Sequence, residues 1–332
     1  MEKINVLSLF DGISCGQLAL LRAGVSINNY YASEINNKAI QVTQHNFPNT
    51  IQLGDVKSVN SNSLEKIDLL IGGSPCTGFS IAGKQLNFQD PRSALFFEFV
   101  RVLTEVKPKY FLLENVKMKK EYQDIISEHL GVEPILINSK DFSAQDRKRL
   151  YWTNIPFNLE YEKNILNTED ILEDQVDEKY IINPQRAVQI LNNEVNRRKI
   201  GYIGSDSQGN RIYSIHNKSV CLCGEAGGLG AKTGLYALPC LTPGRVEKRQ
   251  NGRRFKPPNS KFYTLTTQDM HGVLTNNFIR KLTPIECERL QTIPDNYTFG
   301  SDNQRYKMLG NAWTVDVIAH IFKGLPSLQE NN

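Results

Sequence analysis

The stretch that decides the fold lies near the start of the chain and reads Ile4-Asn5-Val6-Leu7-Ser8-Leu9-Phe10-Asp11-Gly12-Ile13-Ser14-Cys15-Gly16. Its apolar first half predicts a buried strand over 4–10. The glycines that follow predict a tight turn into a helix over 16–23. A strand that passes through a glycine turn into a helix is typical of the first unit of a parallel α/β sheet.

Strand and helix patterns continue to alternate to about residue 155. Further strands are predicted over 29–34, 67–71, 110–113, 134–138 and 150–154, and further helices over 38–47, 93–106 and 122–130. This alternation predicts an α/β fold with a Rossmann-like, doubly wound, mainly parallel sheet. We expect the strand over 150–154 to close one edge of that sheet.

The 332 residues suffice for a large domain and a smaller one. We predict a catalytic and cofactor-binding domain over 1–156, an irregular domain over 157–280, and a return to the first domain over 281–325. Thr283-Pro284-Ile285-Glu286 predicts a helix start, because proline is favoured at the first helical position and an acidic residue in the first turn. A final helix is predicted over 315–322.

The net charge is only +4, but the charges are unevenly distributed. Residues 181–281 contain 16 lysines and arginines against 5 aspartates and glutamates, so the rest of the chain is acidic. A solvated basic face is the ordinary interpretation of such a surplus. Its concentration in one region favours a polyanionic partner such as nucleic acid.

Several protein classes do not fit this sequence. No apolar run approaches the roughly 20 residues that a membrane-spanning helix needs, and the start of the chain does not resemble a signal peptide. The six cysteines show no spacing typical of a disulfide framework. Cys221-Leu222-Cys223 has no second pair at zinc-ligand spacing, so no metal is expected. A reducing cytoplasm, in a bacterial or phage-infected cell, is the expected setting.

Two reactive side chains follow predicted strands. Cys76 comes after Pro75 in a glycine-rich turn that follows strand 67–71, and Glu114 follows the apolar run of strand 110–113. Ligands bind at the carboxyl ends of strands in open α/β sheets. A thiol nucleophile beside a carboxylic acid is therefore predicted, with a buried inert cysteine and an exposed loop carboxylate as the alternatives.

Acidic residues also follow the first three strands. Glu34 stands about 20 positions after the first glycine turn, a spacing suited to ribose hydroxyls, and Asp55 is placed to accept an adenine amino group. A dinucleotide phosphate loop is absent, and Asp11 would repel a pyrophosphate. S-adenosyl-L-methionine, which carries an ammonium and a sulfonium, is therefore favoured over NAD. The alternative that Gly12 and Gly16 only permit a turn stays open.

Taken in order, the motifs of the chain resemble those of the DNA (cytosine-5)-methyltransferases. The matching blocks are Phe10-Asp11-Gly12 with Cys15-Gly16, Pro75-Cys76, Glu114-Asn115-Val116, Gln145-Asp146-Arg147-Lys148-Arg149, Leu282-Thr283-Pro284 with Glu286-Cys287 and Arg289-Leu290-Gln291, and Gly310-Asn311-Ala312. They cover about 1–155 and 260–325, and the basic middle stands where the family has its variable target-recognition domain. A prokaryotic or phage enzyme is indicated, with local resemblance to the animal de novo enzymes at 92–99 and 313–315. Thr77 and Trp313 depart from the common pattern, since many bacterial relatives have glutamine and a small residue there.

The resemblance implies methyl transfer from S-adenosyl-L-methionine to carbon 5 of a flipped cytosine in duplex DNA, with S-adenosyl-L-homocysteine as product. Cys76 would attack carbon 6, and Glu114 would protonate or hydrogen-bond N3 of the ring. Arg147 would hold the base and lie close to Glu114, while Arg149 would support the phosphate or the active-site loop. Asn115 would orient the loop or contact the base amino group. Because side chains alternate along a strand, Arg147 and Arg149 are expected on one face.

The resemblance also implies two sets of binding residues. Cofactor-binding residues would be Phe10, Asp11, Gly12, Cys15, Gly16, Glu34, Ile35, Asp55, Val56, Pro75, Leu95, Asn311, Ala312 and Trp313. DNA-binding residues would be Ser80, Gly83 and Lys84, in a loop over 80–90 that closes on the base or is a plain surface loop, and Arg245, Arg249, Arg253 and Arg254, which would read guanine or neutralise phosphates.

Three other functions remain as alternatives. A transfer-RNA cytosine-5 methyltransferase would share the scaffold, but the Cys-Phe-Thr signature of those enzymes is absent from the chain. A dinucleotide-dependent oxidoreductase would leave Cys76 and Glu114 unexplained, and a silent DNA-binding protein would need neither. The expected partner is double-stranded DNA. The chain is expected to act as a monomer, and a cognate restriction endonuclease acting separately stays an open partner.

Overall fold

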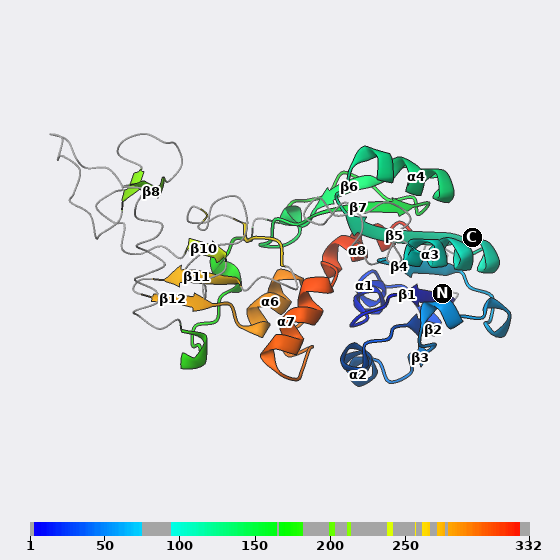
Figure 1. The fold of residues 1–332 in the computed structure, drawn as a ribbon, viewed down its shortest axis with the longest axis horizontal. Coiled ribbons are helices and arrows are strands. Elements are labelled where there is room, and N and C mark those ends of the chain that lie inside the picture. Colours follow the sequence, from blue (N-terminus) through cyan, green and yellow to red (C-terminus); the bar gives the residue numbers. More distant parts are fainter. Residues whose placement is uncertain are drawn as a thin grey trace, which may run out of the picture.

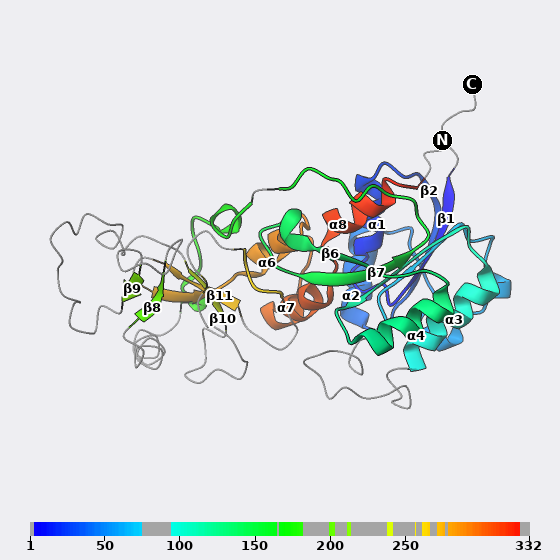
Figure 2. The same ribbon diagram turned by 90° about the horizontal axis from the view of Figure 1, so that it is seen from above.

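The computed structural model describes residues 3–74, 94–164, 166–181, 199–202, 211–213, 238–241, 256, 261–265, 271–275 and 278–325. Its main sheet is built from β1 (Ile4–Leu9), β2 (Ile27–Ser33), β3 (Ile51–Gln52), β4 (Leu69–Gly72), β5 (Tyr110–Val116), β6 (Ile135–Asn138) and β7 (Lys148–Thr153). The seven strands lie in the order β3-β2-β1-β4-β5-β7-β6, and all run parallel except β7 (Figures 1 and 2). The predicted mainly parallel sheet is confirmed.

The last strand of the sheet is placed differently from our expectation. The strand predicted over 150–154 is β7, and it lies between β5 and β6 instead of closing the edge. Its last four residues are all buried, whereas Leu136 of the edge strand β6 is 48% exposed. A strand with a continuous apolar run belongs inside a sheet, and an alternating one suits an edge. The short connection from β6 also requires the two strands to be antiparallel.

Helices cover both faces of the sheet, as the doubly wound prediction requires (Figures 1 and 2). One face packs on α1 (Cys15–Arg22), α2 (Asn37–Asn46) and α8 (Val315–Phe322), and the other on α3 (Ala94–Val106) and α4 (Lys120–Leu130). Successive residues of a strand point to opposite faces. Accordingly, Val6 belongs to the first core cluster and Leu7 to the second.

The middle of the chain contributes short antiparallel strands. β8 (Lys199–Tyr202) pairs with β9 (Arg211–Tyr213), and β10 (Leu238–Leu241), β11 (His271–Thr275) and β12 (Phe278–Lys281) form a second sheet. These strands lie at the far end of the molecule from the main sheet, with α6 (Pro284–Leu290) and α7 (Asp302–Asn311) between them (Figure 1). The domain boundaries given above stay a prediction. Among the described helices none is both long and apolar enough to cross a membrane.

The helix start predicted at Thr283 is confirmed. The Thr283 hydroxyl accepts a hydrogen bond from Glu286 N, the Glu286 carboxylate accepts one from Thr283 N, and Pro284 is the first helical residue. The sequence analysis missed α7. Its signal was present, because Ser301 and Gln304 form a second capping box at its start.

A buried ion pair joins α6 to β12. Arg280 is 4% exposed and Glu286 is fully buried, and the guanidinium donates to the two carboxylate oxygens at 2.8 and 2.6 Å. Glu286 also accepts from Glu173 N at 2.9 Å. A buried pair of this kind is costly to break by removing one partner, since the other charge is left without compensation.

We therefore expect Glu286→Ala to lower the free energy of unfolding by about 3 to 5 kcal/mol. Urea denaturation measures this loss. The matched control is Lys120→Ala, which removes an ion pair with Asp124 whose side chains are 68% and 54% exposed and should change stability little. Similar losses in the two variants would contradict the structural role of the buried pair.

Candidate active site

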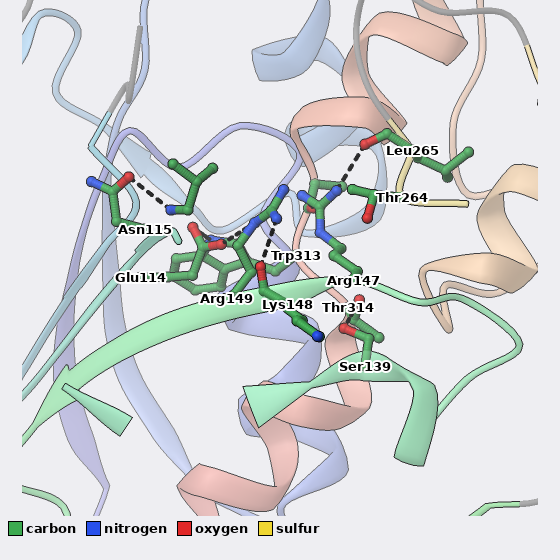
Figure 3. A network of polar contacts seen from close by, with 12 residues as sticks. Glu114, Asn115, Ser139, Arg147, Lys148, Arg149, Thr264, Leu265, Trp313 and Thr314 are labelled. Carbon is green, nitrogen blue, oxygen red and sulfur yellow. Dashed lines mark hydrogen bonds and ion pairs between the residues drawn. The ribbon is translucent and has the colours of Figure 1, made fainter. Parts of the chain in front are cut away.

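The candidate site lies at the carboxyl ends of the parallel strands, where polar groups from separate loops meet (Figure 3). The loops after β1 and β2 are joined by Glu34. Its Oε2 accepts from Gly12 N at 2.8 Å, and its Oε1 accepts from Ile35 N and Asn36 N at 2.9 and 2.8 Å. Because a carboxylate has about four acceptor positions, Oε2 can take one further donor such as a ribose hydroxyl.

Asp11 is the second acidic group of this pocket. Its Oδ1 accepts from the Tyr30 hydroxyl at 2.8 Å, and its Oδ2 is buried with no hydrogen-bond partner in the part of the chain that the structure describes. Burial raises the pKa of Asp11 to about 6, against the opposing hydrogen bond from Tyr30. An unpaired buried carboxylate oxygen is costly until a cation or donor reaches it.

Tyr30 was missed by the sequence analysis. It lies on β2, 19 positions from Asp11, and nothing in its local sequence marks it as a partner of the first loop. Burial and the nearby Asp11 carboxylate raise its pKa well above the usual value, so the hydroxyl stays protonated and donates.

The two glycines of the first loop serve the fold in different ways. Gly12 has a φ of +61°, a conformation that other residues adopt rarely. A Cβ at Gly16 would lie 2.4 Å from Ile71 Cδ1 and 3.1 Å from the Tyr30 hydroxyl oxygen. Gly16 therefore lets α1 pack directly against the sheet.

The other expected cofactor residues differ in their exposure to solvent. Ile35 is 73% exposed, and Asp55 is exposed and accepts a hydrogen bond from Lys57 N. Phe10, with a positive φ, and Leu95, in the first turn of α3, are half-buried, whereas Val56 is buried. Cys15 is also buried, and burial raises the pKa of its thiol to about 12, so this thiol is not the reactive one.

Glu114 is the centre of the site. It lies on β5 and is 9% exposed. Its Oε1 pairs with Arg149 Nε at 2.9 Å, and its Oε2 accepts from the indole N–H of Trp313 at 3.1 Å (Figure 3). An ion pair and a hydrogen bond, which come from distant parts of the chain, thus fix the orientation of this carboxylate.

The two arginines of the fourth motif differ from our expectation. β7 begins at Lys148, so Arg147 precedes the strand instead of sharing a strand face with Arg149. The Arg147 guanidinium is buried and donates to the carbonyl oxygens of Leu265 at 2.9 Å, Ala312 at 3.0 Å and Gly310 at 3.4 Å. Arg149, and not Arg147, forms the ion pair with Glu114.

Asn115 connects β5 to the turn that follows β4. Its Nδ2 donates to the Ser74 hydroxyl at 3.1 Å, and its Oδ1 accepts from Val116 N at 2.8 Å. Both Asn115 and Ser74 are buried. The turn leads directly to Pro75 and Cys76, so Asn115 is placed to orient it.

Several expected site residues lie outside the described part of the chain. They are Pro75 and Cys76, then Ser80, Gly83 and Lys84, and finally Arg245, Arg249, Arg253 and Arg254.

The segment after α7 is held by a buried polar network. Gln291 Nε2 donates to Leu309 O and Ala312 O at 2.8 and 3.2 Å, and the Thr314 hydroxyl donates to Gln291 Oε1 at 3.0 Å. The Ser139 hydroxyl donates to Thr314 at 2.9 Å. Asn311 is exposed and Ala312 is buried within this segment. The sequence analysis quoted Gln291 in a motif but gave it no role.

Comparison with known proteins identifies the family. The model of the family described as C-5 cytosine-specific DNA methylase matches residues 4–327. The chain belongs to this family. It is 31% identical to the orphan methyltransferase M.SPRI of Bacillus phage SPR, with 98% of each chain covered, and 29% identical to the type II methyltransferase M.HhaI of Haemophilus parahaemolyticus, with 96% of this chain and 93% of the relative covered.

Solved structures show the same fold. The Entamoeba histolytica methyltransferase EhMeth has a TM-score of 0.65 at 20% identity, with 98% of each chain covered. The S. pombe Dnmt2 methyltransferase has a TM-score of 0.60 at 16% identity and covers 98% of this chain and 100% of its own. The expected methyltransferase fold is confirmed.

Membership of the family settles the class of enzyme. The chain is a DNA (cytosine-5)-methyltransferase, its substrate is DNA, and methyltransferases of this kind take the methyl group from S-adenosyl-L-methionine. The transfer-RNA alternative is not favoured, because the family model and the named phage and bacterial relatives point to DNA.

Asp11 generates the first prediction for this site. The pKa of Asp11 is about 6 in the folded protein and about 3.8 in the unfolded chain. Because the folded state disfavours the ionised form, the free energy of unfolding decreases as the pH rises from about 4 to 6. Asp11→Asn removes this decrease. Relative to wild type, we expect the variant to gain about 3 kcal/mol of unfolding free energy at pH 7.5 compared with pH 4. Urea denaturation of the ligand-free proteins at the two pH values measures the gain, and an equal difference at both values would contradict it.

The same variant should bind the cofactor product more weakly. If Asp11 Oδ2 meets the ammonium group, Asp11→Asn loses a charge-assisted hydrogen bond, and the affinity for S-adenosyl-L-homocysteine should fall by about 10- to 100-fold. Calorimetric titration measures this affinity. Unchanged affinity in a variant that is more stable would show that Asp11 does not face the ligand.

The two arginines give a contrasting pair of variants. Arg147→Gln leaves buried carbonyl oxygens without donors, so it should lower the unfolding free energy by about 2 to 4 kcal/mol. Arg149→Gln removes the charged partner of the nearly buried Glu114 carboxylate, so it should lower the methyl-transfer rate by about 10-fold or more and also cost stability. Denaturation and single-turnover rates of both variants test this. An Arg147→Gln protein as stable as the wild type would contradict the structural role given to Arg147.

Proposed function

We propose that this chain is a site-specific DNA methyltransferase that modifies carbon 5 of a flipped cytosine through a covalent adduct with Cys76. The observation that carries the proposal is the fixed carboxylate of Glu114. It lies at the end of β5, bound by Arg149 and Trp313, next to the turn that leads to the cysteine. A nucleophile beside a positioned acid is the arrangement that this reaction needs.

The reaction follows from the chemistry of the ring. Carbon 5 of cytosine is a poor nucleophile, so the Cys76 thiolate first forms a bond to carbon 6, and the electron pair of the double bond becomes available at carbon 5. Carbon 5 then takes the methyl group. Loss of the carbon 5 proton restores the double bond as the bond from sulfur to carbon 6 breaks, which frees the thiolate. Water is our candidate for the base that takes this proton, since no histidine stands in a matching motif.

Glu114 acts on the other side of the ring. Its carboxylic acid group protonates or hydrogen-bonds N3, which relieves the negative charge that builds up as the thiolate adds. A proton given to N3 returns to Glu114 as the double bond between carbons 5 and 6 forms again. Arg149 is the cation that pairs with this group and orients it. Asn115 fixes the turn before Cys76 through Ser74.

The cofactor pocket fits S-adenosyl-L-methionine, which supplies the methyl group when bound. Asp11 Oδ2 is a buried carboxylate oxygen with no partner among the described residues, and it suits the ammonium group. The remaining acceptor position of Glu34 suits a ribose hydroxyl, and Asp55 suits the adenine amino group. Ile35, largely exposed, offers an apolar contact for the base.

DNA binding is assigned to the loop over 80–90 and to the basic middle of the chain. Flipping the cytosine costs a few kcal/mol, which contacts of Ser80, Gly83 and Lys84 and of the catalytic pocket would offset. Four arginines, namely Arg245, Arg249, Arg253 and Arg254, would contact guanines or phosphates. A single copy of the chain suffices for docking and flipping, so we propose a monomer.

Transfer of labelled methyl from S-adenosyl-L-methionine to unmethylated genomic DNA tests the proposal, with base-resolution sequencing of the product. We expect methylated cytosines in one short motif, and we expect Cys76→Ala to abolish them because the thiolate is lost. Label in transfer RNA and none in DNA would move the assignment to RNA. Label in DNA from the Cys76→Ala protein would contradict the covalent route.

A further inference from the structure

Trp313 stands at the meeting point of the site. Its indole nitrogen donates to Glu114 Oε2 at 3.1 Å. A Cβ at Gly73 would lie 3.0 Å from this nitrogen, and a Cβ at Gly16 would lie 3.5 Å from Cζ3 on the other ring of the indole. The side chain therefore reaches from the cofactor loop to the turn before Cys76. The two glycines leave the space that it occupies.

We propose that Trp313 is a positioning residue of the methyl-transfer reaction, which holds the Glu114 carboxylate in place through its indole N–H. This inference deepens the proposed function and rests on it, since it assumes that Glu114 acts on the cytosine ring. The resemblance alone had assigned Trp313 to cofactor binding, at a position where a small residue is common.

The geometry of the carboxylate explains why the indole N–H matters. The closest contact of Arg149 is an ion pair between Nε and Oε1 at 2.9 Å, and a carboxylate paired through one oxygen can still turn about its terminal bond. The indole N–H can donate a hydrogen bond but cannot accept one, so Oε2 is always the acceptor in this contact. With both oxygens held, the plane of the carboxylate is set before the base arrives. Preorganisation of this kind lowers the cost of reaching the transition state.

The backbone on either side of Trp313 is immobilised as well. Ala312 O accepts hydrogen bonds from Arg147 and from Gln291, and the Thr314 hydroxyl bonds to Gln291 and Ser139. All four of these contacts are buried. A positioning group works only when its own supports are rigid, and this segment supplies them.

Trp313→Phe is the variant that tests the inference, because it keeps an aromatic ring and removes the N–H. We expect the single-turnover methyl-transfer rate to fall by about 10- to 100-fold, the range for loss of one hydrogen bond to a charged group. Affinity for S-adenosyl-L-homocysteine should stay within about threefold of wild type, because the apolar ring is largely retained.

The chain offers a matched control in its other tryptophan. Trp152 lies on β7, is fully buried, and donates its indole N–H to the Ser127 hydroxyl at 3.1 Å. Trp152→Phe therefore makes the same chemical change away from Glu114. It should lower the thermal stability and leave the transfer rate within about twofold of wild type.

A double-mutant cycle with Glu114→Gln separates positioning of Glu114 from packing. If Trp313 acts through the carboxylate, Trp313→Phe should change the single-turnover rate by less than about threefold in the Glu114→Gln background. The same fall in both backgrounds, or a parallel loss of S-adenosyl-L-homocysteine affinity, would overturn the inference and leave Trp313 as a packing or cofactor residue. A Trp313→Phe variant that transfers the methyl group at the wild-type rate would also overturn the inference. Wild-type protein that methylates no DNA would instead contradict the proposed function itself.

Discussion

The buried guanidinium of Arg147 is the interaction on which the rest of the site depends. Its donors reach carbonyl oxygens 118, 163 and 165 positions away, in the segment over 261–265 and in the turn after α7. One side chain thereby joins the start of β7, the edge of the basic region and the C-terminal return of the chain. Arg149 and Trp313, the ion-pair and hydrogen-bond partners of Glu114, stand on two of the three segments that it joins.

Local patterns predicted most of the elements of the main sheet but not all of their neighbours. The strand over 150–154 was recognised from its apolar run, and its place between β5 and β6 was not, because a run does not say which strands will flank it. The helix at Pro284 was predicted since its start signals are contiguous. The helix α7 was missed although its capping box is also contiguous, because its buried residues Met308, Leu309 and Gly310 are adjacent and show no helical apolar spacing.

In the site, too, local patterns predicted some residues and missed those that depend on distant contacts. Glu34 and Asp11 were found because they follow strands, and parallel strands bring their carboxyl ends to one edge. Tyr30, Gln291 and the pairing of Arg149 with Glu114 were not predicted. They depend on contacts between residues far apart in sequence, and on a strand that begins one residue later than the two-residue alternation assumed. The alternation of side chains between the two faces of a sheet holds only for residues within the strand.

The edge of the basic region is anchored to the residues that precede β7. Phe262 N donates to Ala144 O, Asp146 N donates to Phe262 O, and the Thr264 hydroxyl donates to Asp146 O. Lys256 reinforces this contact, because its ammonium donates to Phe262 O and lies 3.8 Å from an Asp146 oxygen. The backbone held in this way runs straight into β7. The segment over 261–265 and Arg149, which pairs with Glu114, are therefore held by the same stretch of backbone over residues 144–149.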